Sequence, residues 1–266
     1  MKWKNWELET GRADKTAILR INRPEARNAI NRHAMDEFEE ILGVLERDEA
    51  LGCVVLSGEG DRAFIAGGDL KDFSLLDTPE RGQAMSARMQ GLLNRWEDLP
   101  VPTIAAIGAN AYGGGCEVAL ACDIRVMSEG THLVFSQARL GLLTGWGGSS
   151  RLVQCVGKSR AILILTTGEY LKAQEALGMG LIAEVAPEGF ALAHALDIAR
   201  KITRHPRMAI AGMKRAVLAG ARMEPSQAQK VENDWFGKRW NSEEHRSAVA
   251  RFLGDSGAKN PEEMGE

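Results

Sequence analysis

The sequence predicts a layered α/β fold, and three observations lead to it. Apolar runs of strand length alternate with amphipathic helical segments from about residue 16 to residue 185. Two glycine-rich turns, at 66–70 and 113–117, each follow an apolar segment and lead towards a predicted helix. Beyond about residue 190 only helical spacing remains. We therefore expect an α/β core over 1–200 and a helical C-terminal region over 201–266.

Local patterns define the elements before the first glycine turn. Residues 16–21 form a strand-like run that Pro24 closes. Asn31 is a predicted N-cap, because its side chain can accept a hydrogen bond from the first turn of the helix that follows. A buried strand at 53–57 then ends at Gly58. The apolar face of the predicted helix is formed by Ala34, Met35, Phe38, Ile41, Leu42 and Leu45.

Three further elements lie between the turns and in the tail. A helix is predicted at 79–98, with an apolar face whose methionines are typical of core packing. A strand at 101–107 leads to the second glycine turn, and the helix after it is expected to include 118–122. The charged helical tail is too thin to hold a core alone, so it is expected to pack on the main domain or on another subunit.

Composition excludes several classes of function. The chain of 266 residues is 44% hydrophobic and 26% charged, with a net charge of −3, which argues against a dedicated nucleic-acid binder. Its four cysteines form no CxxC pair and lie far from the histidines, so no metal site is expected. The N-terminus lacks a signal-peptide core, and no apolar run approaches the ~20 residues of a membrane span. We expect a cytoplasmic protein with neither membrane nor nucleic-acid partners.

The glycine turns suggest a specific chemistry. Glycine lets the main chain approach a ligand closely and expose its N–H groups. Two such turns can direct one N–H each at the same oxygen, which would make an oxyanion hole for a carbonyl that gains negative charge. Glu117 is the only ionisable group inside the second turn. It is therefore the candidate to move a proton beside that oxygen.

Five motifs in register resemble the enoyl-CoA hydratase/isomerase (crotonase) superfamily over nearly the whole chain. They are Asn22-Arg23-Pro24-Glu25-Ala26-Arg27-Asn28-Ala29, Ala66-Gly67-Gly68-Asp69-Leu70, Ala111-Tyr112-Gly113-Gly114-Gly115-Cys116-Glu117 followed by Ala121-Cys122-Asp123, Arg139-Leu140-Gly141-Leu142, and Gly147-Gly148-Ser149-Ser150-Arg151-Leu152. The resemblance implies a spiral of ββα units with a helical C-terminal region. It also implies assembly as homotrimers or dimers of trimers.

The same resemblance assigns roles to matching residues. The main-chain N–H groups of Gly68 and Gly114 are expected to hold the oxygen of an acyl-CoA thioester, with Glu117 as the proton-transferring group. Coenzyme A is then part of the substrate, and no permanently bound cofactor is expected. The positions expected to border the substrate are Arg27, Ala29, Ala66, Gly68, Asp69, Leu70, Lys71, Tyr112, Gly114 and Trp146.

Gln137 is a departure that bears on the reaction. Two-glutamate hydratases of the family have a second carboxylate at this position, whereas a glutamine has no proton to exchange near neutral pH. We therefore expect a lyase that decarboxylates a 2-alkylmalonyl-CoA, since that reaction needs one proton donor. The segments 145–153, 77–80 and 89–90, with Glu232-Asn233-Asp234 and Trp240, also resemble ethylmalonyl-CoA decarboxylases. A one-glutamate enoyl-CoA hydratase and a catalytically silent acyl-CoA-binding protein remain as alternatives.

The roles of Trp146 and Arg139, which lie in the later motifs or next to them, have two interpretations each. Trp146 either caps the acyl pocket and restricts substrate size, or packs as an ordinary core residue. Arg139 either pairs with a carboxylate of a malonyl-type substrate or forms a salt bridge at the surface or with another subunit.

Overall fold

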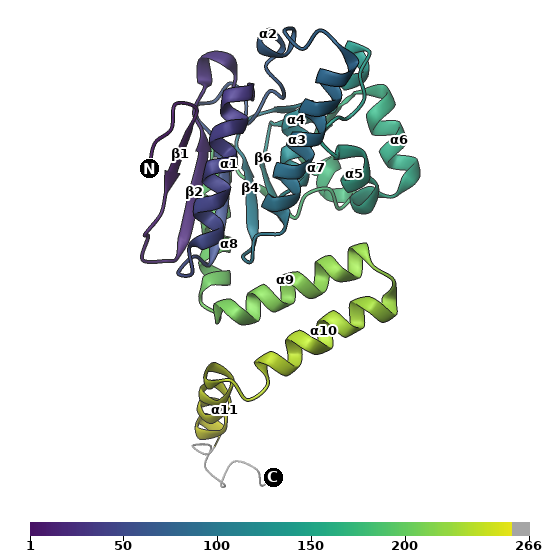
Figure 1. Cartoon of the computed structure of the whole chain (residues 1–266). Helices are drawn as coiled ribbons and strands as arrows, with labels where there is room; N and C mark the ends of the chain where they lie inside the picture. The colour runs from purple at the N-terminus through teal and green to yellow at the C-terminus, as the bar shows by residue number, and fades with distance from the viewer. Residues whose placement is uncertain (257–266) are drawn as a thin grey trace. The chain divides into compact units, whose positions relative to one another are not determined.

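The computed structural model describes residues 1–256, and the chain divides into two compact units (Figure 1). The first unit runs from Met1 to Arg204 and contains all the strands of the described residues. The second begins at His205 and is helical through its described part. The predicted α/β core and helical C-terminal region are thus confirmed as fold class.

A six-stranded sheet forms the centre of the first unit. Its strands, in spatial order, are β1 (Trp6–Glu9), β2 (Thr16–Ile21), β3 (Cys53–Gly58), β4 (Thr103–Ile107), β6 (Ile124–Ser128) and β9 (Glu184–Ala186). Only β1 is antiparallel to its neighbour, and the strands from β2 onwards pair in parallel. Parallel strands need both faces covered, which explains the nearly continuous burial of β2, β3 and β4.

A second, smaller sheet lies beside the glycine turns. It consists of β5 (Ala111–Tyr112), β7 (His132–Val134) and β8 (Tyr170–Lys172), with β7 in the middle. Strand β5 leads directly into the second glycine turn. An isolated parallel bridge between Ile65 and Ala111 joins β5 to the segment before the first glycine turn.

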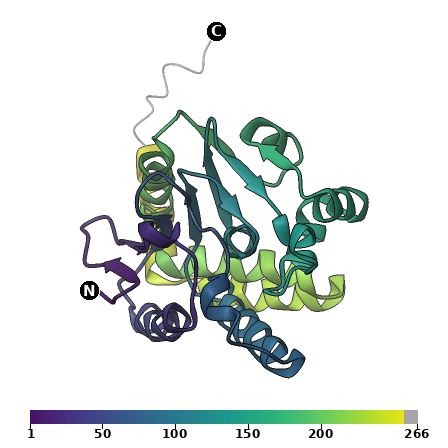
Figure 2. The same ribbon diagram turned by 90° about the horizontal axis from the view of Figure 1, so that it is seen from above.

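Helices cover both faces of the main sheet. Helices α1 (Arg32–Arg47) and α3 (Pro79–Glu97) contact each other, and Figures 1 and 2 show them side by side on one face. Helix α8 (Ala191–Thr203) packs on β3 and β4 and covers a second cluster of buried apolar residues. The remaining helical segments of this unit are η1 (Pro24–Ala26), α2 (Leu70–Phe73), α4 (Gly114–Leu120), η2 (Ser136–Leu140), α5 (Gly148–Val156), α6 (Lys158–Thr167) and α7 (Ala173–Gly178).

Most elements lie where local patterns predict them. Strand β2 has its predicted bounds, and the side chain of Asn31 accepts a hydrogen bond from the Ala34 amide at 2.7 Å as the N-cap of α1. Helix α3 begins at the predicted Pro79, with Thr78 as its cap. In α3 Met89 is buried in the core, and Met85 is half-buried and packs against the same core, so the core interpretation holds for both methionines.

Two expectations on element bounds are corrected, and one strand was not predicted. Strand β1 has no counterpart in the predicted elements. Strand β4 begins at Thr103, later than the predicted 101, because Pro102 has no amide hydrogen to offer a ladder. Helix α4 ends at Leu120 instead of continuing through 118–122. The Asp123 carboxylate accepts hydrogen bonds from the amide and hydroxyl of Thr103 at 2.7 and 2.9 Å, which draws the chain into β6.

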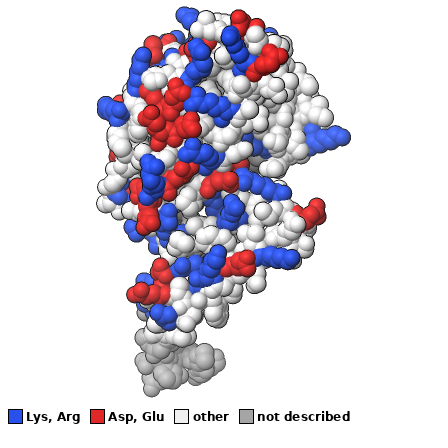
Figure 3. Space-filling view, in the orientation of Figure 1, with Lys and Arg blue, Asp and Glu red and all other residues white. Residues whose placement is uncertain are grey.

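The second unit consists of α9 (Arg207–Arg222), α10 (Pro225–Arg239) and α11 (Glu243–Ser256). Helices α9 and α10 pack against each other. No helix within residues 1–256 is long and apolar enough to span a bilayer. On the face seen in Figure 3, acidic and basic side chains are interspersed, in keeping with the small net charge.

Candidate active site

The first glycine turn is joined to the segment after η1 by main-chain hydrogen bonds. The Ala66 amide donates to the Arg27 carbonyl at 3.1 Å, and the Ile30 amide donates to the Gly67 carbonyl at 2.8 Å. The Asp69 amide in turn donates to Ile30 at 2.9 Å. The structure thus brings together the predicted positions in 27–29 and 66–69.

The second glycine turn lies directly against the first. The Tyr112 amide donates to the Ile65 carbonyl at 3.0 Å, beside the bridge between Ile65 and Ala111. A Cβ built on Gly67 would lie 3.0 Å from the Gly114 nitrogen, and one on Gly115 would lie 1.9 Å from the Ile65 oxygen. The two turns are therefore in van der Waals contact, and position 115 has room only for glycine.

Two amides of these turns have no acceptor among the residues that the structure describes. Neither the Gly68 nor the Gly114 N–H donates to any atom of residues 1–256. Gly67 (φ 94°) and Gly113 (φ 50°), which immediately precede them, adopt positive φ angles that side chains disfavour. The turns accordingly present two free donors from neighbouring stretches of main chain.

The carboxyl of Glu117 lies at the start of α4 and is fixed from three directions. Glu117 is only 2% exposed. One oxygen, Oε2, accepts hydrogen bonds from the amides of Trp146 and Gly148, both at 2.8 Å. The other, Oε1, accepts a hydrogen bond from Gln137 Nε2 at 3.0 Å. The carboxyl therefore has one oxygen held by two amides and one oxygen with spare capacity.

Burial controls the ionisation of this carboxyl. Removal from water raises the pKa of Glu117 above its ordinary value of 4.5, while the amides of Gly148 and Trp146 and the side chain of Gln137 oppose that rise. The net result is a raised pKa. Such a carboxyl holds its proton at a higher pH than an exposed glutamate does, which suits a group that exchanges protons during catalysis.

Gln137 is a direct neighbour of Glu117, and one of its atoms has no partner. It lies in η2, and its Nε2 donates to the carboxyl. Its Oε1 is buried and accepts no hydrogen bond from any described residue. A buried acceptor without a donor is costly, so Gln137 Oε1 keeps an unused capacity to accept a hydrogen bond.

Trp146 lies at the site as well. A Cβ built on Gly114 would lie 2.3 Å from the indole Cζ3, and one on Gly68 would lie 3.5 Å from Cζ2. The benzene ring of the indole therefore contacts both turns, and the residue is 4% exposed. A Cβ on Gly148 would meet Glu117 Cγ at 2.6 Å, so glycine at 148 is what lets the carboxyl reach the amide.

The sequence did not predict that the turn at 146–148 donates main-chain hydrogen bonds to the Glu117 carboxyl. Main-chain N–H groups carry no side-chain signature, and the only hint was the glycine pair Gly147-Gly148. Helix α3 secures this turn, because Gln90 donates to the Gly145 carbonyl at 2.8 Å. Met85 of the same helix accepts a weak hydrogen bond from the Trp146 indole N–H at 3.4 Å.

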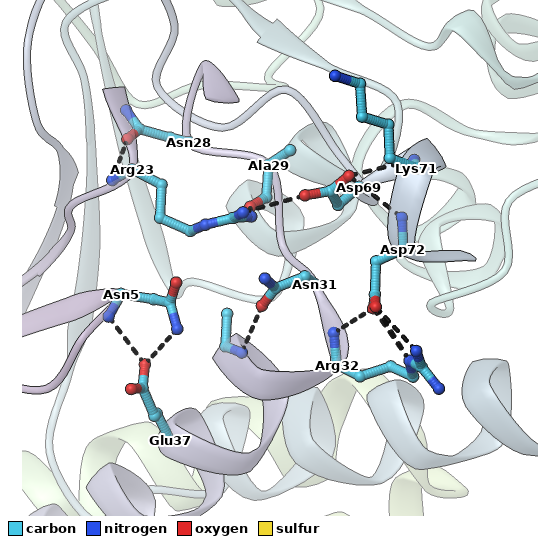
Figure 4. A network of polar contacts seen from close by, with 11 residues as sticks. Asn5, Arg23, Asn28, Ala29, Asn31, Arg32, Glu37, Asp69, Lys71 and Asp72 are labelled. Carbon is cyan, nitrogen blue, oxygen red and sulfur yellow. Dashed lines mark hydrogen bonds and ion pairs between the residues drawn. The ribbon is translucent and has the colours of Figure 1, made fainter. Parts of the chain in front are cut away.

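Two ion pairs hold the end of the first turn and the helix α2 that follows it (Figure 4). Arg23 pairs with Asp69 at 3.0 Å and also donates to the Ala29 carbonyl. Arg32 pairs with Asp72 at 2.9 Å, and its main-chain amide donates to the same carboxylate. The second oxygen of Asp69 accepts from the Lys71 amide as the cap of α2. The sequence motif contained Arg23, but only the structure assigns it this contact.

Several predicted positions lie at the edge of this arrangement. Leu70 and Lys71 have exposed side chains on α2. The Tyr112 hydroxyl accepts a hydrogen bond from Asn110 at 3.0 Å. Arg139 donates to the Gly168 carbonyl at 2.5 Å, and its guanidinium lies 5.3 Å from the centre of the Tyr170 ring. Within residues 1–256 no group of three or more His, Cys, Asp or Glu side chains is arranged to hold a metal ion.

Comparison with known proteins places these features in a family. The chain matches Enoyl-CoA hydratase/isomerase over residues 12–258. It is 33% identical to the short-chain-enoyl-CoA hydratase of Clostridium acetobutylicum over 239 residues, which cover 90% of this chain and 91% of that protein. It is 31% identical to the 2,3-dehydroadipyl-CoA hydratase of Escherichia coli over 247 residues, or 93% and 95% of the two chains. A solved structure of an enoyl-CoA hydratase from Bacillus anthracis matches with a TM-score of 0.90 at 27% identity, over 95% and 97% of the chains.

Proposed function

The chain belongs to the enoyl-CoA hydratase/isomerase family and has the crotonase fold, and on this basis we propose that it hydrates the double bond of an enoyl-CoA thioester. The observation that carries the proposal is the buried Glu117 carboxyl, which lies in the helix that the free Gly114 amide begins and has a buried acceptor of Gln137 next to it. The relatives compared above are named hydratases. They favour the hydratase alternative of the sequence analysis over decarboxylation.

The free amides of Gly68 and Gly114 supply the oxyanion hole of this proposal. Both donate to the thioester oxygen, and their hold strengthens as the oxygen gains charge in the enolate. Each such donor is worth about 3 kcal/mol in well-studied oxyanion holes. Gly114 is also the first residue of α4, where the helix dipole favours negative charge.

The proton path of the proposal runs through Glu117 Oε1. Its other oxygen is occupied by two amides, so Oε1 is the atom that exchanges the proton. A water donates one hydrogen to Glu117 Oε1 and the other to the buried Gln137 Oε1. The carboxylate takes the first proton as the hydroxyl adds to the β-carbon, and the carboxyl then returns that proton to the α-carbon. The net result is the addition of one water across the double bond.

Glu117→Gln tests the proposal. Hydration of crotonyl-CoA, followed by loss of the enoyl absorbance, is expected to slow by at least ~100-fold, since the amide has no proton to exchange. Glu37→Gln is the matched control, because Glu37 is equally buried but is bound to the Lys4 and Asn5 amides. Its turnover is expected to match that of the wild type. Unchanged turnover in Glu117→Gln removes this carboxyl from the mechanism.

Decarboxylation of a 2-alkylmalonyl-CoA is the second candidate, and Gln137 favours it. The neighbour of the Glu117 carboxyl is an amide, so the site brings one exchangeable proton where two-carboxylate hydration uses two groups. Loss of CO₂ from an enolate-forming thioester needs only one proton donor. CO₂ release from ethylmalonyl-CoA far faster than crotonyl-CoA hydration would move the assignment to this reaction. Tight binding of acyl-CoA with neither reaction would indicate the silent binding protein.

A further inference from the structure

We propose that the Trp146 indole sets the length of the acyl chain and selects short-chain thioesters. The proposal rests on the proposed function for its substrate class, an acyl-CoA held by the Gly68 and Gly114 amides. It goes beyond that function by naming the side chain that discriminates among acyl groups.

The indole is positioned to contact the reacting carbons. Its six-membered ring lies against Gly114 and near Gly68, so it borders any carbonyl that takes a hydrogen bond from both amides. The main chain of the same residue donates to Glu117 Oε2 at 2.8 Å. Residue 146 thus contacts the carboxyl through its main-chain amide and the glycines through its ring, so the ring borders the space that we assign to the α- and β-carbons.

The indole is also held too firmly to move aside. The ring nitrogen donates to Met85 Sδ at 3.4 Å, and the main-chain carbonyl of Trp146 accepts a hydrogen bond from Arg151 at 3.0 Å. Arg151 is in turn fixed by Asn94 at 2.8 Å and Glu97 at 3.4 Å. With 4% of the residue exposed, a rotation of the ring would require repacking of its surroundings. A wall of this kind excludes atoms that a mobile side chain would admit.

A fixed aromatic wall discriminates against each added methylene. In apolar enzyme pockets one methylene changes kcat/KM by roughly 10–200-fold. We therefore expect the wild type to prefer crotonyl-CoA over trans-2-octenoyl-CoA by at least ~100-fold in kcat/KM. Replacing the indole by a smaller apolar side chain should open the space beyond the β-carbon.

The experiment compares both substrates in Trp146→Leu and Trp146→Ala. The crotonyl to octenoyl ratio of kcat/KM is expected to fall at least ~10-fold in either variant. Trp6→Phe is the matched control, a fully buried tryptophan in β1 that stacks on Phe38 at 5.3 Å. Its ratio should equal that of the wild type. A ratio that stays at the wild-type value in a folded Trp146→Leu, or a wild type without chain-length preference, overturns the proposal.

A binding measurement separates this proposal from the proposed reaction. Dissociation constants of the unreactive butyryl-CoA and octanoyl-CoA are measured by calorimetry for the wild type and Trp146→Leu. Tighter relative binding of octanoyl-CoA to the variant supports the indole as the wall, even if crotonyl-CoA is not hydrated by either protein. Equal ratios in the two proteins overturn the proposal, even if hydration is fast.

Discussion

The Glu117 carboxyl is subject to two opposing influences, and their balance defines its chemistry. Burial favours the neutral form, while the Trp146 and Gly148 amides and the Gln137 side chain favour the charged form. Burial prevails, so the pKa of Glu117 is raised. The sequence predicted Glu117 and the position of Gln137, because both are side chains in recognisable motifs. The sequence did not predict that the main-chain amides of Trp146 and Gly148 bind this carboxyl, because every residue except proline has an N–H group.

The raised pKa of Glu117 has a consequence for stability. Between 4.5 and its pKa in the folded protein, the folded state binds more protons than the unfolded state, so this residue makes the free energy of unfolding fall as pH rises through that window. Glu117→Gln has no such proton to lose. We expect its urea-unfolding free energy to decline less steeply over that window than that of the wild type. Parallel pH profiles for the two proteins contradict the burial-raised pKa.

Gly114 illustrates a position where one methyl group matters. The Cβ of Gly114→Ala would lie 2.3 Å from Trp146 Cζ3, so we expect a loss of about 1–3 kcal/mol in unfolding free energy. Hydration of crotonyl-CoA should fall in parallel, since the displaced amide no longer points correctly.

Gly91→Ala is the matched control for this substitution. Gly91 lies on α3, and a Cβ there meets nothing within 4 Å. Alanine is expected to stabilise the helix by about 0.5–1 kcal/mol and to leave hydration unchanged. Equal unfolding free energies for the two variants in urea titrations would refute the predicted clash.

At the scale of elements, α2 is a short helix held mainly by what surrounds it. It has four residues and none of them is buried, so packing alone does not fix it. Asp69 caps it and pairs with Arg23, while Asp72 pairs with Arg32 and has its pKa lowered by that hydrogen bond. The position of the Gly68 amide therefore depends on ionic contacts from Arg23, which precedes η1, and from Arg32 of α1.

Arg23→Ala is expected to be the more damaging of two similar substitutions. The side chains of Arg23 and Asp69 are 12% and 17% exposed, and removing one partner leaves the other charge largely buried. A loss of about 2–4 kcal/mol in unfolding free energy follows, with a fall in kcat for crotonyl-CoA. Arg32→Ala removes a pair that is 45% and 24% exposed, and about 1 kcal/mol or less is expected. Equal losses of unfolding free energy in Arg23→Ala and Arg32→Ala, measured in urea, would contradict a larger contribution from the Arg23–Asp69 pair.

The limits of sequence-based prediction are also clearest for elements. Long elements such as α1 and α3 were predicted because many turns repeat one apolar spacing. Strands β5, β7 and β8 have two or three residues each, too few for a periodic pattern. They exist because a neighbouring strand offers them hydrogen bonds, and that neighbour is remote in the sequence.

At the scale of the whole molecule, the second unit has large exposed apolar side chains. They include Met213, Val217, Phe236, Trp240 and Phe252, each more than 60% exposed. Apolar surface of this extent is typical of a site that other protein surface covers. We propose assembly of three copies, or of two such trimers, in keeping with the expectation from the sequence.

Solution mass tests this assembly. Light scattering on the purified protein is expected to give three or six chains per particle. Val217→Asp in α9, a side chain that is 71% exposed, should shift the particle to smaller masses if α9 contributes to the interface. A wild type of one chain over the whole concentration range would contradict the proposal.

The parallel bridge between Ile65 and Ala111 affects how the two glycine turns are spaced. It joins the two amide-bearing turns through backbone alone, and adjacent strands keep a spacing of roughly 4.8 Å whichever side chains they bear. In the proposed reaction, the gap between the two amides that would hold the thioester oxygen is thus set by sheet geometry. On this proposal, substitutions of side chains around the two turns could change the substrate while the spacing of the two amides is kept.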